Sequence, residues 1–296
     1  MRSLGDKIAS TIIAQSAGVS CIEWSGQDAR ISDDRIRSLN SDDPIYKKAC
    51  IFSLEQLEKI ATEIGFPLMI KASWGGGGKG IRIVHRFQDL IIGYQNVIQE
   101  LPGSPVFAMK VCENARHLEI QIVADNYLNV TTLFGRDCTI QRRHQKIVEE
   151  APICIAPAAT IRSMERAAIS LAKSVGYKNV GTVEFLYDVE HDKFYFLELN
   201  PRLQVEHPTT EMITDINIPA LQVQIAEGKS LFQIKDIRRL YGKSLDETDD
   251  FNLDLDSRRP PIGHVIAARI TAERATEGFA PQGGSVHNIC FRSSPN

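Results

Sequence analysis

The sequence of 296 residues has no long apolar run, little net charge and no paired cysteine motif. No apolar stretch approaches the length of a membrane span, and the N-terminus lacks the basic and then apolar order of a secretory signal. A net charge of −3 gives no general attraction for nucleic acid or anionic membranes. The six cysteines form no CxxC pair and no Cys/His zinc spacing. These absences predict a cytoplasmic protein with reduced thiols that binds neither nucleic acid nor membrane.

The residues that are present predict an α+β fold with antiparallel sheets. Hydrophobic residues make up 43% of the chain and charged residues 24%, as in a globular protein with a large core. Predicted strands mostly follow one another in hairpins with helices between them, which argues against a doubly wound parallel sheet. Segments 25–44 and 244–257 lack periodicity and are expected to be surface loops, the first with one helical turn. The predicted helices are 5–17, 53–64, 88–100, 157–175 and 209–228. The predicted strands are 19–24, 66–73, 81–84, 106–112, 116–124, 130–134, 181–187, 193–199 and 263–273. Polar and apolar residues alternate in 116–124, so that strand is expected to be half-buried.

A glycine-rich loop joins two of these strands, and it reads Gly75, Gly76, Gly77, Gly78, Lys79 and Gly80. Glycines let backbone N–H groups approach phosphate oxygens. The loop is no Walker A motif, because a strand follows it and Gly80 stands where Ser or Thr is needed. A hairpin lid over phosphates fits better, and a flexible surface hairpin is the alternative. Lys71, just before the loop, favours the lid, since an inward-facing lysine needs an anion. A protein kinase is excluded because the HRD and DFG motifs are missing.

A metal site is predicted at the end of an apolar strand. Glu198 and Asn200 are two residues apart, so both point to one face of that strand, and oxygen ligands on one face suit Mg²⁺. A hairpin turn near 190–191 would place Glu184 on the neighbouring strand. Two carboxylates across a ladder repel each other unless a cation lies between them. The three residues are therefore expected to share a divalent ion with nucleotide phosphates; the alternative is that the glutamates face solvent on opposite sides.

Two polar segments are expected beside this metal site. Pro201 ends the strand, so Arg202, Gln204 and Glu206 should lie on a turn at its end, where cationic, amide and acidic groups converge. The basic run 141–146 has apolar flanks. It is either a solvated face or a cluster that neutralises a nucleotide γ-phosphate.

Several long motifs resemble one enzyme family. They read KASWGGGGKG, RHLEIQI, GRDCTIQRRHQKIVEEAP, GTVEFL and LELNPRLQVEHPTTEM. In this order they resemble the biotin carboxylases of the ATP-grasp superfamily. GDKIASTIIAQ, RPPIGHVIAARIT and FRSS are similar to the biotin carboxylase part of eukaryotic acetyl-CoA carboxylases. The resemblance covers essentially the whole chain.

The resemblance implies an ATP-grasp fold and a ligase reaction. Bicarbonate would attack the γ-phosphate of ATP, with Mg²⁺ or Mn²⁺ bound, to give carboxyphosphate. This species would carboxylate biotin on a separate carrier domain, as in the biotin carboxylase step of fatty acid biosynthesis. A carboxyltransferase would lie elsewhere, and a homodimer is possible. The rival hypotheses are a truncated nucleotide-binding paralogue without turnover and another ATP-grasp ligase, against which the Arg202–Glu206 segment and Arg269 argue.

The resemblance also implies roles for individual residues. Those that would bind or cover the nucleotide are Lys7, Lys71, Gly75 to Gly80, Lys110, Cys112, His117, Gln141, His144 and Lys146. Those that would bind the metal are Glu184, Glu198 and Asn200. Those that would handle bicarbonate and biotin are Arg202, Gln204, Val205, Glu206 and Arg269. Lys146 would hold the γ-phosphate, Arg202 would hold bicarbonate, Glu206 would deprotonate it, and Arg269 would stabilise the biotin enolate. In a closed site Glu206 is expected to have a raised pKa, which suits a base.

The resemblance to the family also implies a division of the chain. Residues 1–50 would be the remnant of an N-terminal domain, 51–112 the start of the ATP-grasp region with its lid, 113–228 the catalytic and metal-binding part, and 229–296 a partial C-terminal domain. The chain is thus expected to be truncated at both ends. Trp74 departs from the family pattern, in which this position is small or acidic, and its ring is expected to affect the hinge of the lid.

Overall fold

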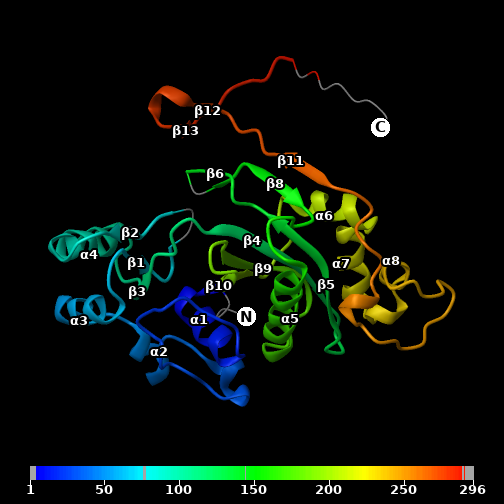
Figure 1. Cartoon of the computed structure of the whole chain (residues 1–296), viewed down its shortest axis with the longest axis horizontal. Helices are drawn as coiled ribbons and strands as arrows, with labels where there is room; N and C mark the ends of the chain where they lie inside the picture. Colours follow the sequence, from blue (N-terminus) through cyan, green and yellow to red (C-terminus); the bar gives the residue numbers. More distant parts are fainter. Residues whose placement is uncertain (1–4, 76–77, 144, 289, 291–296) are drawn as a thin grey trace.

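A six-stranded antiparallel sheet forms the centre of the molecule, and a smaller three-stranded sheet lies beside it (Figure 1). The computed structural model describes residues 5–75, 78–143, 145–288 and 290. Strands of the large sheet run in the order β10-β9-β4-β5-β8-β11, and every neighbouring pair is antiparallel. The predicted α+β class with antiparallel sheets is confirmed. In the part of the chain that the structure describes, no helix has both the length and the apolar character needed to cross a bilayer.

Helices cover both faces of the large sheet. Its strands are β4 (Arg116–Ala124), β5 (Val130–Asp137), β8 (Val148–Ala151), β9 (Asn179–Asp188), β10 (Lys193–Asn200) and β11 (Val265–Ala268). Helices α1 (Lys7–Ser16) and α5 (Ala158–Ser174) share one hydrophobic core with Ile122, whereas α7 (Ile218–Ala226) and α8 (Lys235–Leu240) share another with Val123. Successive residues of β4 therefore face different cores. The expectation of a half-buried 116–124 strand was wrong, because both of its faces are covered from Leu118 onward.

The smaller sheet carries the glycine-rich loop. Its strands are β2 (Ile81–Val84), β1 (Leu68–Ala72) and β3 (Val106–Lys110), in that order, with helices α3 (Leu54–Ile64) and α4 (Leu90–Glu100) packed against it. Ser53 caps α3 by accepting from the Gln56 N–H, and Gly65 ends this helix, as predicted. Strand β1 is central, so Lys71 lies opposite both Ile81 and Phe107. The predicted glycine-rich hairpin joins β1 to β2.

Segment 19–24 is not a strand, contrary to the prediction. It makes only two isolated bridges, from Cys21 to Phe196 on β10 and from Trp24 to Met109 on β3. These two partners lie on edge strands of different sheets. The segment therefore links the small sheet to the large one, and its apolar residues fill the space between them.

Two further predicted elements are divided in the structure. The helix predicted for 209–228 is α6 (His207–Thr214) and α7, because Asp215 adopts a left-handed conformation and Asn217 caps α7 ahead of Pro219. The strand predicted for 263–273 is β11 and a separate β12 (Glu273–Arg274), which pairs with β13 (Ala280–Pro281) away from the large sheet (Figure 1).

The remaining elements are short. They are α2 (Pro44–Ala49), β6 (Gln141–Arg142), β7 (Gln145–Lys146) and the 3₁₀ helices Asp33–Ser38, Phe87–Asp89, Leu231–Gln233, Leu255–Ser257 and Ala275–Glu277. The expectation that 25–44 is a surface loop was partly wrong, because Ala29, Ile31, Ile36 and Leu39 are buried. The acidic segment 244–257 is largely irregular, as predicted, although Asp249 pairs with the buried Arg238 at 2.7 Å.

Candidate active site

A cavity of about 510 Å³ lies between the glycine-rich hairpin and the large sheet. The hairpin supplies one wall, and β9, β10 and the turn after β10 supply the opposite wall. Fifteen of the residues singled out in the sequence line this cavity: Lys7, Lys71, Gly75, Gly78, His117, Gln141, Lys146, Glu184, Glu198, Asn200, Arg202, Gln204, Val205, Glu206 and Arg269. The structure thus gathers residues from positions 7 to 269 into a single site.

The predicted metal ligands face one another on adjacent strands. Glu198 is the register partner of Glu184 across the β9–β10 ladder. The Asn200 amide nitrogen donates to Glu184 Oε1 at 3.0 Å and to Glu198 Oε1 at 3.2 Å. The alternative, in which the two glutamates point to opposite sides, is excluded. The two carboxylates supply hard oxygen ligands, and Asn200 would add a third if its side-chain amide turned over to present Oδ1, so the residues present fit a Mg²⁺ ion.

His117 orients the Glu184 carboxylate from the neighbouring strand. His117 Nε2 lies 2.7 Å from Glu184 Oε2, and Gln141 Nε2 lies 2.8 Å from His117 Nδ1. If the Gln141 amide donates to Nδ1, then Nε2 carries the proton that His117 donates to the carboxylate. Burial opposes protonation of His117, but the hydrogen bond to Glu184 outweighs it and raises the pKa of the imidazole.

Lys146 lies at the centre of three carboxylates. Its ammonium donates to Glu184 at 2.7 Å, to Glu206 at 2.6 Å and to Glu119. Burial opposes the charge, but these carboxylates raise the pKa of Lys146 above its usual range. Lys146 is therefore a permanent cation in this site, held by partners that a bound phosphate would have to share.

The pKa of Glu206 corrects the sequence-based expectation. Burial favours the neutral acid, but Lys146 outweighs burial and lowers the pKa of Glu206 below its usual value. The raised pKa expected for a base was therefore wrong for this arrangement. The expectation considered only the loss of water around the Glu206 carboxylate, which raises its pKa. It did not consider a lysine in contact with that carboxylate, which lowers the pKa.

A buried arginine below the cavity was missed in the sequence. Arg136 on β5 is fully buried and donates to Glu119 and to Gln121 Oε1 at 2.9 Å, both on β4. It also donates to Thr210 Oγ1 at 2.7 Å, which ties α6 to the sheet. The alternation of Glu119 and Gln121 within an apolar strand was the available signal for a polar partner on that face. It could not identify Arg136 as that partner.

Lys71 lies near the end of β1, and no carboxylate of the described residues is in contact with its ammonium. Its exposed fraction is 6%, and its ammonium approaches Met109 Sδ at 3.5 Å and the Phe107 ring at 5.8 Å. Burial, assisted by Lys7, lowers the pKa of Lys71 to about 8, and only Glu198 opposes this. A buried lysine with such weak partners is suited to receive an anion from the cavity.

The start of α1 is fastened to the base of the glycine loop. Asp6 caps α1 by accepting from the Ala9 N–H at 2.9 Å. The same carboxylate accepts from Ser73 Oγ at 2.7 Å, from Tyr46 OH at 2.8 Å and from Trp74 Nε1 at 3.0 Å. Lys7 donates to the Gly75 carbonyl. The exposed Trp74 ring is therefore tied to the N-terminus of α1 at the hinge of the loop.

Some predicted binding residues lie away from the cavity. Lys79 is exposed, and the Lys110 ammonium donates to the Phe66 carbonyl at 2.8 Å. Four of the predicted residues are not among those that line the cavity: Lys79, Gly80, Lys110 and Cys112. Gly80 has a φ of 69°, and a Cβ there would lie 2.6 Å from the Leu101 side chain, so backbone geometry and packing account for this glycine. Gly76, Gly77 and His144 lie outside the described residues.

The basic run divides between the cavity and the C-terminal arm, by which we mean the segment after β11 that contains β12 and β13. Strands β6 and β7 form a two-residue ladder that directs Lys146 into the site. Arg142, however, pairs with Glu273 at 2.6 Å and stacks on the Phe279 ring at 4.5 Å, while Arg143 donates to the Gly278 carbonyl at 3.1 Å. Of the two alternatives for the run, the phosphate-neutralising cluster therefore fits Lys146 but not these two arginines, which contact the segment around β12 and β13 instead.

The turn after β10 presents groups of opposite sign. Arg202 is exposed, and its guanidinium donates to the Leu203 carbonyl at 3.2 Å. Gln204 donates to Glu184 Oε1 at 3.1 Å, while its own Oε1 is buried with no hydrogen-bond partner among the described residues. The exposed Arg269 enters from the end of β11, where its N–H donates to the Ile147 carbonyl at 2.8 Å. Two exposed cations therefore line the same cavity as Glu206 and the Gln204 amide.

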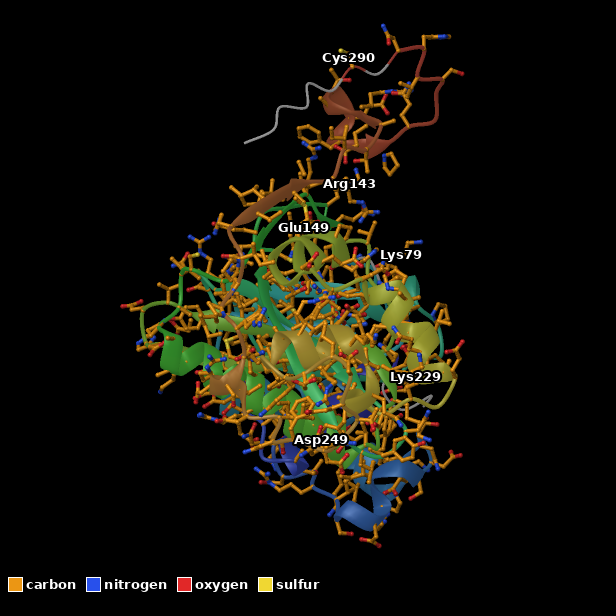
Figure 2. All side chains as sticks on the ribbon, turned by 90° about the vertical axis from the view of Figure 1, so that its right-hand side faces the viewer. Lys79, Arg143, Glu149, Lys229, Asp249 and Cys290 are labelled. Atoms are coloured by element: carbon orange, nitrogen blue, oxygen red, sulfur yellow. The ribbon has the colours of Figure 1, made fainter. Side chains whose placement is uncertain are left out.

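Glu149 is a second residue that the sequence did not single out. It lies on β8 below the C-terminal arm (Figure 2), is 3% exposed, and has one carboxylate oxygen without a partner among the described residues. Burial, together with Glu206 and Glu119, raises the pKa of Glu149. It adds a fourth carboxyl group to the set around Lys146 and Arg136.

Comparison with known proteins places this chain in a family. Residues 31–234 match the family model described as "Carbamoyl-phosphate synthase L chain, ATP binding domain". The chain is 54% identical over 309 residues to "Acetyl-CoA carboxylase" of Schizosaccharomyces pombe, and 55% identical over 300 residues to "Acetyl-CoA carboxylase, mitochondrial" of Saccharomyces cerevisiae strain YJM789. In both alignments all of this chain but only 13% of the relative is covered.

A solved structure supports the same relationship. The biotin carboxylase domain dimer of Hydrogenobacter thermophilus 2-oxoglutarate carboxylase, in complex with MgADP, ADP and bicarbonate, has a TM-score of 0.75 and 33% sequence identity. The alignment covers 95% of this chain and 53% of that chain. The chain thus spans about half of the matched biotin carboxylase structure and a small part of the matched carboxylases.

Proposed function

The chain belongs to the carbamoyl-phosphate synthase L chain ATP-binding family and corresponds to the biotin carboxylase region of acetyl-CoA carboxylase, and from this membership we propose that it carries out ATP-dependent carboxylation of biotin by bicarbonate. The observation that supports the proposal most strongly is that Glu184 and Glu198 face each other in the cavity that Lys71 also lines. Lys146 joins Glu184 to Glu206 in the same cavity. This arrangement offers one place for a divalent ion, one for phosphates and one for a small acid.

The nucleotide phosphates would bind between the hairpin and the large sheet. Lys71 and Lys7 would pair with them from the hairpin side, and the glycines Gly75 and Gly78, which line the cavity, would allow the loop to lie close above them. Glu184, Glu198 and Asn200 would hold Mg²⁺, which would neutralise phosphate charge during transfer. A loop that excludes water is required, because carboxyphosphate hydrolyses readily.

Glu206 would remove the proton of bicarbonate, and Lys146 would control when it does so. While Lys146 contacts Glu206, the carboxylate has a lowered pKa and is a weak base. A γ-phosphate that attracts Lys146 would weaken this contact and make Glu206 more basic. Proton removal would then begin only after ATP is in place, with Arg202 holding the bicarbonate anion.

Arg269 would stabilise the negative charge that develops on the ureido oxygen of biotin when its nitrogen loses a proton. Biotin would arrive on a carrier domain, and the carboxyltransferase would be a separate unit. A homodimer is part of the proposal because the Hydrogenobacter thermophilus relative is described as a dimer. The cytoplasmic location stays a prediction, since one relative is named as mitochondrial.

Measuring phosphate release from Mg–ATP, with and without bicarbonate and free biotin, tests the proposal. Release that requires bicarbonate is the expected result, and free biotin is expected to increase carboxylated product. ATP binding without bicarbonate-dependent release would favour the rival hypothesis of a nucleotide-binding paralogue without turnover. Glu206→Gln serves as the matched variant, because it keeps the shape of the side chain and removes its basicity.

A further inference from the structure

Three side chains that the proposed carboxylation does not use lie together at the outer face of β8 and β11: Glu150 on β8, Cys154 after the end of β8 and His264 directly before β11. Glu150 is the register partner of Ile266, so Glu150 and His264 are diagonal neighbours on one face of this antiparallel pair. Ile266 is 66% exposed, whereas Glu149, the neighbour of Glu150, faces the opposite side and is buried. The cluster therefore opens to solvent, and the strands separate it from the cavity.

The three side chains form a hydrogen-bonded chain. His264 Nε2 lies 2.8 Å from Glu150 Oε1, and Cys154 Sγ lies 3.6 Å from His264 Nδ1. With its Nε2 proton donated to Glu150, the imidazole presents the lone pair of Nδ1 to the thiol. Cys154 Sγ also approaches the Pro152 carbonyl at 3.3 Å. Of these two acceptors only the imidazole can accept the proton, and the resulting order is nucleophile, base and orienting carboxylate.

We propose that Cys154 is an activated thiol and a modification site for small electrophiles, including hydrogen peroxide. His264 takes the thiol proton, and the thiolate attacks one oxygen of the peroxide. The O–O bond breaks as the S–O bond forms, so sulfur is oxidised by two electrons to a sulfenic acid. The second oxygen leaves as water after accepting the proton from the imidazolium. This inference is independent of the proposed carboxylation.

The other cysteines of the chain provide a contrast. Burial raises the pKa of Cys21 and of Cys50 to about 12, and it also raises the pKa of Cys112 and Cys138. These thiols are poor nucleophiles at neutral pH. Cys290 is exposed like Cys154 and lies at the far end of the C-terminal arm (Figure 2). It provides an internal reference for a thiol that solvent reaches.

The test is the rate at which iodoacetamide alkylates each cysteine of the full chain at pH 7, followed by mass spectrometry. Cys154 is expected to react at least about tenfold faster than Cys290. A chelator is present throughout, because thiolate, imidazole and carboxylate groups also bind zinc. Hydrogen peroxide followed by a sulfenic-acid-specific probe is expected to label Cys154 first.

Variants separate activation from simple exposure. His264→Asn is expected to reduce the Cys154 rate about tenfold without changing the Cys290 rate, and Glu150→Gln is expected to reduce it less. His191→Asn is the matched control, because His191 also pairs with a carboxylate, Asp188, at 2.8 Å, but lies on a distant turn. The proposal is overturned if Cys154 reacts no faster than Cys290, or if folded His264→Asn protein keeps the wild-type rate at Cys154.

Discussion

At the scale of single residues, most charged side chains of the site form ion pairs with one another. Lys146 joins Glu119, Glu184 and Glu206, and Arg136 holds Glu119 from below. Lys71, by contrast, contacts no carboxylate in the part of the chain that the structure describes. The two lysines therefore have pKa shifts of opposite sign, although both are largely buried. Lys71 is therefore the lysine that is predicted to lose its charge as the pH rises above about 8, whereas Lys146 keeps its charge.

Nucleotide affinity should depend on the charge of Lys71. With a pKa of about 8, Lys71 is protonated below that pH and loses its charge above it, whereas in the unfolded chain it would stay charged to about 10.5. Affinity for a non-hydrolysable Mg–ATP analogue is expected to fall roughly tenfold between pH 7 and 9.5. Titration calorimetry across this range measures the effect. Lys71→Met should bind weakly with little pH dependence, and a wild-type affinity as constant as that of this variant would refute the role of Lys71.

Glu206 and Glu198 should separate binding from chemistry. Glu206→Gln is expected to keep Mg–ATP binding and to lose at least about a hundredfold of bicarbonate-dependent turnover.

Glu198→Ala is expected to weaken Mg–ATP binding itself, because one of the two facing carboxylates is lost. Binding is measured by calorimetry and turnover by phosphate release. Unchanged turnover in the first variant, or unchanged binding in the second, would remove that residue from its proposed role.

At the scale of elements, local patterns predicted what lies within one hairpin or helix. The β9–β10 hairpin and its facing glutamates followed from period-two alternation and a short turn. The break between α6 and α7 was missed, although Asn217 followed by Pro219 is a typical helix start. Because the segments on both sides of residues 215–217 have helical periodicity, the sequence was interpreted as one continuous helix. Arg136 was missed for another reason: pairing with Glu119 depends on which strands become neighbours, and sequence spacing does not contain that information.

The ion pair between β4 and β5 should contribute strongly to stability. Arg136→Met leaves Glu119 buried beside Lys146 alone, and the free energy of unfolding is expected to fall by about 3–5 kcal/mol. Urea unfolding followed by circular dichroism measures this change. The Arg35–Asp43 pair, at 2.5 Å, offers the control, because the Arg35 side chain is exposed and Arg35→Met is expected to change stability by less than about 1 kcal/mol. Equal losses in the two variants would contradict the account.

The contact between α1 and the glycine loop predicts a second loss of stability. Asp6 serves as helix cap and accepts from three side chains, so Asp6→Ala is expected to cost about 2 kcal/mol in the free energy of unfolding. Trp74→Phe removes only one of these hydrogen bonds and should cost less than about 1 kcal/mol. Thermal unfolding of both variants provides the measurement. If Trp74→Phe destabilises as much as Asp6→Ala, the carboxylate is not the centre of this contact.

At the scale of the whole molecule, the functional residues come together because two sheets are fixed side by side. The segment around Cys21 and Trp24 bridges an edge strand of each sheet, and α1 fastens the loop between them. Family resemblance predicted the ATP-grasp fold and most of the lining of the cavity, including Arg269, which no local pattern identified. Arg202 was already indicated by the turn after Pro201. The fourfold division of the chain stays a prediction.

The most direct test of carboxyphosphate formation follows one oxygen atom. If an oxygen of bicarbonate attacks the γ-phosphate, ¹⁸O-labelled bicarbonate must leave one labelled oxygen on the released phosphate when the carbon departs to biotin. Mass spectrometry of the phosphate from Mg–ATP, free biotin and labelled bicarbonate measures this transfer. The account predicts labelled phosphate. Phosphate without label would mean that water is the attacking group, and no phosphate release at all would mean that this chain binds the nucleotide without the proposed chemistry.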